Sequence, residues 1–134
     1  MIRRSVLIGS SLVLLIGIFI FNDPPSFFYA DLPFQSLSKQ TVILLLKQSD
    51  EQMNKLAFDE EVVWYGTIAD QGKEIDRLVS GMKKDGWSFL HQEGSGYFFE
   101  QGDEKIVITS ETWSNHFVLF KVPVTRHAIT LSNN

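Results

Sequence analysis

Residues 60–86 read EEVVWYGTIADQGKEIDRLVSGMKKDG, and in them a strand pattern passes directly into a helix pattern. β-Branched and aromatic residues dominate 60–69, and the polar residues 70–72 supply a turn, which predicts a strand that ends there. The following residues predict an amphipathic helix over 73–85, with acidic residues in its first turn and lysines in its last. Its apolar residues recur at the spacing of one helix face: Ile75, Leu78, Val79 and Met82.

Four short β patterns follow this helix, and the gaps between them have the length of hairpin loops. The predicted strands cover residues 87–92, 97–100, 105–109 and 116–122. Pro123 is expected to end the last strand, and residues 124–134 are expected to form a tail. The order β-α-β-β-β-β predicts an α+β domain over 59–123, in which an antiparallel sheet carries the 73–85 helix on one face.

The stretch before this domain, residues 36–58, is harder to assign. Its apolar residues recur at helical spacing, but polar residues interrupt them, and 42–46 is apolar on all sides. The run from Ser49 to Gln52 fits a capping box, which predicts a helix that starts there and a break near Gln48. Two helices, or a strand and then a helix, both agree with this pattern.

An uncharged run, VLIGSSLVLLIGIFIF, extends from Val6 to Phe21. Its sixteen residues would form a helix about 24 Å long, somewhat under the roughly 30 Å of a bilayer core, which suits a short anchor or a signal peptide. Arg3 and Arg4 are the only charges before Asp23, so the positive-inside rule places residues 1–5 in the cytoplasm.

The residues after this run decide between an anchor and a removed signal peptide. Cleavage after Ala30 would put Phe28 at the −3 position, which is a poor fit to the small residues that such a site needs. Residues 22–35 hold three of the four prolines and predict an extended connector. We therefore predict that 6–21 is an uncleaved transmembrane signal anchor in the bilayer of the cytoplasmic membrane, with the domain outside the cytoplasm.

The composition excludes several classes of function. The chain has 134 residues and no cysteine, which rules out a disulfide scaffold, a thiolate metal site and a cysteine nucleophile. Residues 22–134 hold ten basic and sixteen acidic residues, a net charge of −6 that argues against nucleic acid as a partner.

The titratable residues give no site that can be assigned from spacing. His91 and Glu93 lie two residues apart in a predicted strand and share one face, but one strand supplies only two metal ligands. A third ligand from His116 requires a strand pairing that the pattern does not give. No hydrolase, phosphate-binding or dinucleotide-binding motif is present. We expect no metal, no cofactor and no catalysis, with a small envelope hydrolase whose site forms in the fold as an alternative.

Aromatic residues are frequent for so small a domain. Trp64 and Tyr65 are adjacent in a predicted strand, so one of the two rings is exposed unless residues 36–58 cover the second face of the sheet. The apolar run 42–46 needs burial, which favours coverage. An open face would make Trp64, Tyr65 and Trp113 binding residues. We expect a protein partner in the same membrane or envelope, with a cell-wall glycan as the alternative.

Overall fold

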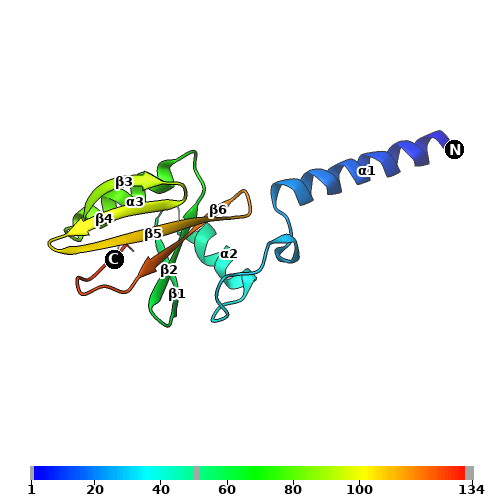
Figure 1. The fold of residues 1–134 in the computed structure, drawn as a ribbon. Coiled ribbons are helices and arrows are strands. Elements are labelled where there is room, and N and C mark those ends of the chain that lie inside the picture. The colour runs from blue at the N-terminus through cyan, green and yellow to red at the C-terminus, as the bar shows by residue number, and fades with distance from the viewer. Residues whose placement is uncertain (1, 50–51, 132–134) are drawn as a thin grey trace. The chain divides into compact units, whose positions relative to one another are not determined.

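The computed structural model describes the backbone of residues 2–49 and 52–131 and the side chains of 9–49 and 52–131. The chain forms two compact units, Met1–Ala30 and Asp31–Asn134. Figure 1 labels the helices and strands of both units. The second unit holds the sheet.

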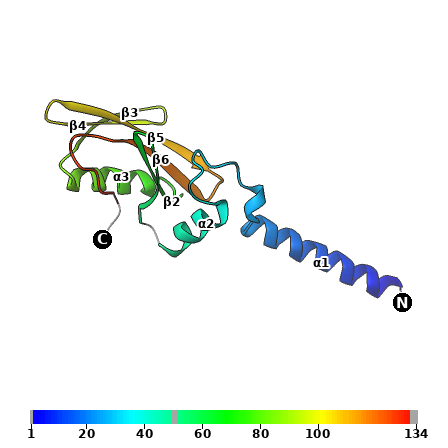
Figure 2. The same ribbon diagram turned by 90° about the horizontal axis from the view of Figure 1, so that it is seen from below.

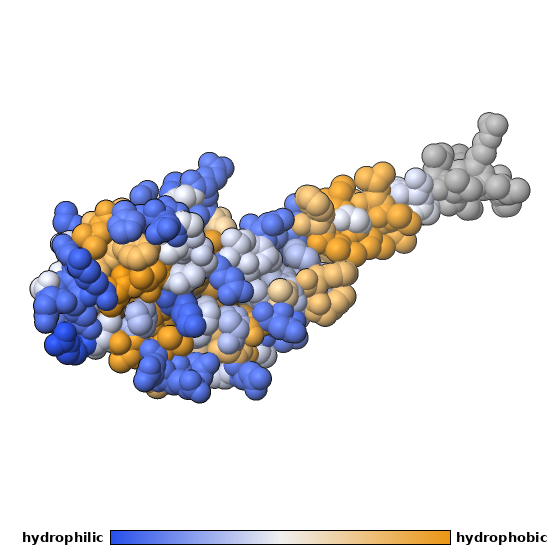
Figure 3. Space-filling model, viewed as in Figure 1, coloured by the Kyte–Doolittle hydropathy of each residue, from blue (hydrophilic) through white to orange (hydrophobic). Residues whose placement is uncertain are grey.

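The first unit consists of helix α1 (Ile2–Asn22) and a 3₁₀ turn, η1 (Ser26–Phe28). The helix ends where Pro24, which has no N–H, restricts the residue before it, as the sequence predicts. Apolar side chains cover the described part of α1, and Figure 3 shows them as a continuous apolar surface. Within the described part of the chain, no helix combines the length and the hydropathy needed to cross a membrane.

The second unit is built on a six-stranded sheet in which every neighbouring pair is antiparallel. The order of strands across the sheet is β1-β2-β6-β5-β4-β3. The strands are β1 (Asn54–Asp59), β2 (Val62–Ile68), β3 (Ser88–Glu93), β4 (Gly96–Gln101), β5 (Glu104–Trp113) and β6 (Phe117–Pro123). The α+β prediction and the meander from β3 to β6 are confirmed. Strand β5 extends four residues beyond the predicted 105–109.

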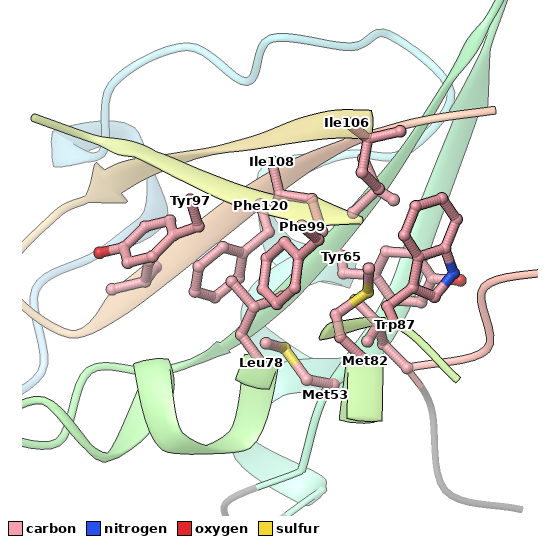
Figure 4. Close-up of a cluster of buried hydrophobic side chains, with 13 residues drawn as sticks. Met53, Tyr65, Leu78, Met82, Trp87, Tyr97, Phe99, Ile106, Ile108 and Phe120 are labelled. Atoms are coloured by element: carbon pink, nitrogen blue, oxygen red, sulfur yellow. The ribbon is translucent and has the colours of Figure 1, made fainter. Parts of the chain in front are cut away.

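Helix α3 (Lys73–Lys84) confirms the predicted amphipathic helix and lies along one face of the sheet (Figure 2). Gly86 takes a left-handed backbone conformation, with φ of 87°, just after the helix ends, as expected for a C-terminal glycine. Figure 4 shows Leu78 and Met82 from α3 packed against Phe99 and Phe120 from the sheet. This cluster is the main core of the unit.

Residues 36–58 form a helix and then a strand, which corrects both predicted alternatives. Helix α2 (Lys39–Gln48) begins at the cap Ser38, whose hydroxyl accepts a hydrogen bond from the N–H of Thr41 at 3.2 Å. The predicted break near Gln48 is confirmed. The capping-box helix is wrong, since Ser49 ends α2 and β1 begins at Asn54; Asp50 and Glu51 lie outside the described residues.

Helix α2 packs on the face of the sheet opposite α3. A Cβ atom at Gly66 would lie 3.0 Å from a Leu46 methyl and 3.3 Å from a Leu119 methyl. In sequence, Gly66 follows Tyr65 and Leu119 precedes Phe120, and both aromatic residues belong to the core that faces α3. Because successive residues of a strand face opposite sides, positions 66 and 119 face the other side of the sheet. Leu46 is fully buried there. The second face is therefore covered over β2 and β6, as the burial argument for 42–46 favours.

Candidate functional site

The three aromatic residues predicted to bind a partner are buried, with exposed fractions of 6% for Trp64, 3% for Tyr65 and 1% for Trp113. The Trp64 ring lies 5.8 Å from the ring of Phe34, so the connector helps α2 to cover the second face. Tyr65 points into the α3-facing core. Trp64 and Tyr65 therefore have a packing role. This is the role expected if residues 36–58 cover the second face of the sheet.

The predicted metal candidates share a face but have no third ligand. His91 stacks on Phe98, with ring centroids 4.4 Å apart, and Glu93 pairs with Gly96 on the same face. His116 lies in the turn before β6, where its backbone carbonyl accepts a hydrogen bond from Ala69. Among the described residues, no three histidine or carboxylate side chains are grouped so that they could hold a metal ion.

The second face is open over β3, β4 and β5. His91, Phe98 and Val107 are direct neighbours across these three strands and form a short stripe, which we call the outer stripe. Val107 is 41% exposed. The outer stripe is one exposed apolar region of the second unit, and Leu44 and Leu45 on α2 form another.

Residues 124–131, which we call the C-terminal strap, follow β6. The predicted tail is in fact packed on the domain: Leu131 is 4% exposed and belongs to the main core, and Ile129 packs against it. The Tyr65 hydroxyl donates to the Ile129 carbonyl at 3.3 Å, and the Thr130 N–H donates to an Asp85 carboxylate oxygen at 2.6 Å. The strap is thus attached along its length.

A second carboxylate holds the middle of the strap. The two oxygens of Glu104 contact the Arg126 N–H at 3.3 Å and the His127 Nδ1 at 2.8 Å. The hydrogen bond from His127, and to a lesser degree the charge and N–H of Arg126, hold the pKa of Glu104 below its ordinary value. The edge of the His127 ring also lies against Trp87, with ring centroids 6.0 Å apart.

Between the strap and the sheet lies a cavity of about 210 Å³, which we call the strap pocket. Its lining is mostly apolar, with the Tyr65 ring and the His127 ring as its largest polar groups. The principal lining residues are Val63, Tyr65, Val122, Val124, His127 and Ile129. They come from β2, β6 and the strap, so no local sequence pattern marks the pocket.

The strap pocket adjoins the tight turn between β1 and β2. The Val124 N–H, at the rim of the pocket, donates to the carbonyl of Glu61 in that turn at 2.8 Å. Val124, which lines the pocket, is 56% exposed. Phe58 on the neighbouring strand is 61% exposed and lines a separate hollow with Pro33 to Ser36.

The turn itself is acidic. Asp59, Glu60 and Glu61 are exposed, and among the described residues none forms an ion pair with them. Glu60 has φ of 52°, the left-handed region that is costly for a residue with a side chain. Because a run of carboxylates usually faces water, the sequence pattern does not indicate the pocket beside them. The alternating apolar residues of the strap, Ile129 and Leu131, are the signal that could have indicated its burial.

No protein-family model, curated protein or solved structure matches this chain. The candidate site is therefore argued from its own geometry.

Replacing Trp64 by alanine is expected to lower the free energy of unfolding by about 3–5 kcal/mol, because it removes a buried indole that packs on Phe34. Val107→Ala, on the outer stripe, is the control and should cost less than about 1 kcal/mol, since the side chain is already 41% exposed. Urea denaturation followed by circular dichroism measures both. Equal losses in the two variants would contradict the covered second face.

The attachment of the strap by Glu104 is expected to depend on pH. Because folding lowers the pKa of Glu104, its carboxylate stabilises the fold above the ordinary pKa of this group, about 4. That contribution is lost as the pH falls through the lowered folded value. The stability gap between the wild type and Glu104→Gln, measured by denaturation from pH 7 to pH 3, should therefore shrink at the acid end. A gap that stays constant would show that the contact with His127 does not stabilise the charged carboxylate.

Proposed function

We propose that this protein is a small membrane-anchored binding module, whose domain lies outside the cytoplasm and acts on a protein partner without catalysis. The observation that carries the proposal is the strap pocket with the exposed Val124 at its rim. Exposed apolar patches beside a concave site are a common feature of surfaces that bind other proteins.

The anchor is supported by the first unit. Arg3 and Arg4 precede the uncharged run from Val6 to Phe21. These two positive charges favour an orientation with the N-terminus in the cytoplasm. The large side chains of α1 from Leu12 to Phe21 are apolar and exposed, and such a surface is unfavourable in water. The run is shorter than an average span, so the proposed anchor is a short one, and a shorter hydrophobic segment is accommodated by local thinning of the bilayer.

Two exposed aromatic residues extend this argument. Phe27 and Phe28 in η1 are 74% and 61% exposed, and their ring centroids lie 4.4 Å apart. Aromatic side chains just beyond an apolar run are typical of the interface between lipid and water. They fit an interfacial position next to the proposed anchor.

Protease added to intact spheroplasts is expected to digest the second unit, because the proposed topology exposes it on the outer side of the membrane. An antibody against an N-terminal tag detects the remaining anchor. Arg3→Glu combined with Arg4→Glu should reduce the digested fraction, since it removes the charges that orient the chain. Protection of the domain until the membrane is lysed would reverse the topology, and a shorter soluble product would establish cleavage.

A photocrosslinking amino acid placed at Val124 is expected to give discrete protein crosslinks in intact cells. The same amino acid at Lys83, on the exposed side of α3, is the control and should give none. Digestion of the cell wall before electrophoresis should leave the crosslinked bands unchanged. Products that disappear on this digestion would favour the glycan alternative, and absence of crosslinks from Val124 and from the outer stripe at Val107 would contradict a protein partner.

A further inference from the structure

We infer that the strap pocket binds a short segment of the partner that carries an apolar side chain next to basic residues. The inference rests on the proposed function and names the chemistry of the partner at that site. The apolar side chain enters the pocket, and the basic residues contact the acidic turn of Glu60 and Glu61.

The size of the pocket determines which side chain of the partner can enter it. A cavity of about 210 Å³ exceeds the roughly 150 Å³ that holds a benzene molecule in a protein interior. It therefore has room for one leucine or phenylalanine side chain. Val63 and Val122 provide an apolar floor, and Ile129 provides a wall from the strap. Burial of one such side chain increases the affinity by about tenfold or more, as expected of an anchor residue in an interface.

The charges around the pocket determine which charge the flanking residues of the partner carry. Arg126 and His127, the basic groups of the strap, already contact Asp103 and Glu104. The carboxylates of Glu60 and Glu61, in the turn that the Val124 N–H joins to the rim, have no such partner among the described residues. The turn beside the pocket therefore carries two exposed carboxylates, and charge complementarity favours a basic segment.

The distance between the strap pocket and the acidic turn determines how far apart the apolar and the basic residue of the partner lie in its sequence. The hydrogen bond between the Val124 N–H and the Glu61 carbonyl joins the rim of the pocket directly to the acidic turn. One residue of extended chain spans about 3.3 Å. A lysine or arginine one to three residues from the apolar anchor thus reaches the turn while the anchor occupies the pocket.

A fluorescent peptide, acetyl-Gly-Ser-Lys-Gly-Leu-Lys-Ser-Gly, tests this inference on the full chain in nanodiscs of zwitterionic lipid, with empty nanodiscs as background. Fluorescence anisotropy is expected to show saturable binding that weakens with salt. Replacing the leucine of the peptide by serine should reduce the affinity about tenfold, because the pocket loses its occupant. Equal binding of the two peptides would overturn the inference.

Variants of the protein locate the binding. Glu60→Lys with Glu61→Lys should weaken binding about tenfold and should favour a peptide with glutamates in place of the lysines. Glu93→Lys with Glu111→Lys makes the same charge change on the open sheet face and is the matched control, with affinity expected to stay within about twofold. An equal effect of the two double variants would show only general electrostatic attraction and would overturn the inference.

Filling the pocket provides an uncharged test. Val63→Phe should abolish binding of the leucine peptide by occupying the floor of the pocket, and circular dichroism checks that the domain is folded. If Val63→Phe is unfolded, Ala128→Leu at an exposed position of the strap is used in its place. Unchanged affinity in the folded variant would place the peptide elsewhere.

The crosslinking experiment separates failure of this inference from failure of the proposed function. Protein crosslinks from Val107 but not from Val124, together with no peptide binding, would overturn the strap pocket as the site and retain a protein partner. Protein crosslinks from neither position would contradict the proposed function itself. Crosslinks of Val124 to lipid alone would replace the peptide by an acyl chain as the occupant and would also overturn the inference.

Discussion

The pairing of β2 with β6 is the interaction on which the rest of the second unit depends. Seven residue pairs, from Val62 with Pro123 to Ile68 with Phe117, join the β1–β2 hairpin to the last strand of the meander. Since β6 also pairs with β5, it lies in the interior of the sheet and is buried on both faces, with Phe117 to Phe120 all buried. A strand buried on both sides reads as a continuous apolar run rather than an alternating one. Both layers of the core, under α3 and under α2, meet at this strand.

This pairing also creates the candidate site. It places Val63 of β2 beside Val122 of β6, and the strap continues directly from the end of β6 across that point. The strap pocket therefore exists because the chain leaves the sheet next to the β1–β2 turn. The same geometry explains the hydrogen bond between Val124 and Glu61. A protein partner that contacts the pocket would contact a structure built from β2, β6 and the strap.

The parts of the fold that were predictable from sequence are those determined by local pattern. The apolar spacing in α3 is local, and so are the hairpin-sized gaps of the meander. Strand β1 was missed because its register shifts between Lys55 and Ala57. With this bulge, Leu56 and Ala57 are both buried, and the alternation that signals a strand is lost. Whether the Trp64 side chain is buried or exposed depends on coverage by α2 and Phe34. The residue pattern of β2 alone gives no information about that coverage.

The candidate site was harder to predict from the sequence, because it also depends on contacts between distant parts of the chain. Val63, Val122 and Ile129 are far apart in sequence, and each alone resembles an ordinary core residue. The acidic turn was visible, but a run of carboxylates is normally a solvated surface. Only the hydrogen bond between Val124 and Glu61 shows that this surface borders an apolar cavity.

The backbone of the acidic turn adds an argument that does not rest on charge alone. Glu60 has a left-handed conformation, which costs roughly 1 kcal/mol for a residue with a Cβ atom and almost nothing for glycine. Tight turns between two strands usually place glycine, asparagine or aspartate at such a position. This chain instead carries a glutamate there, beside a second glutamate and next to the strap pocket. Such a conformation occurs at binding sites and also in ordinary turns, and Gln71 and Ser114 adopt it elsewhere in the domain. The acidic turn combines this conformation with charge and an adjacent apolar cavity, which are the features on which the proposed binding site rests.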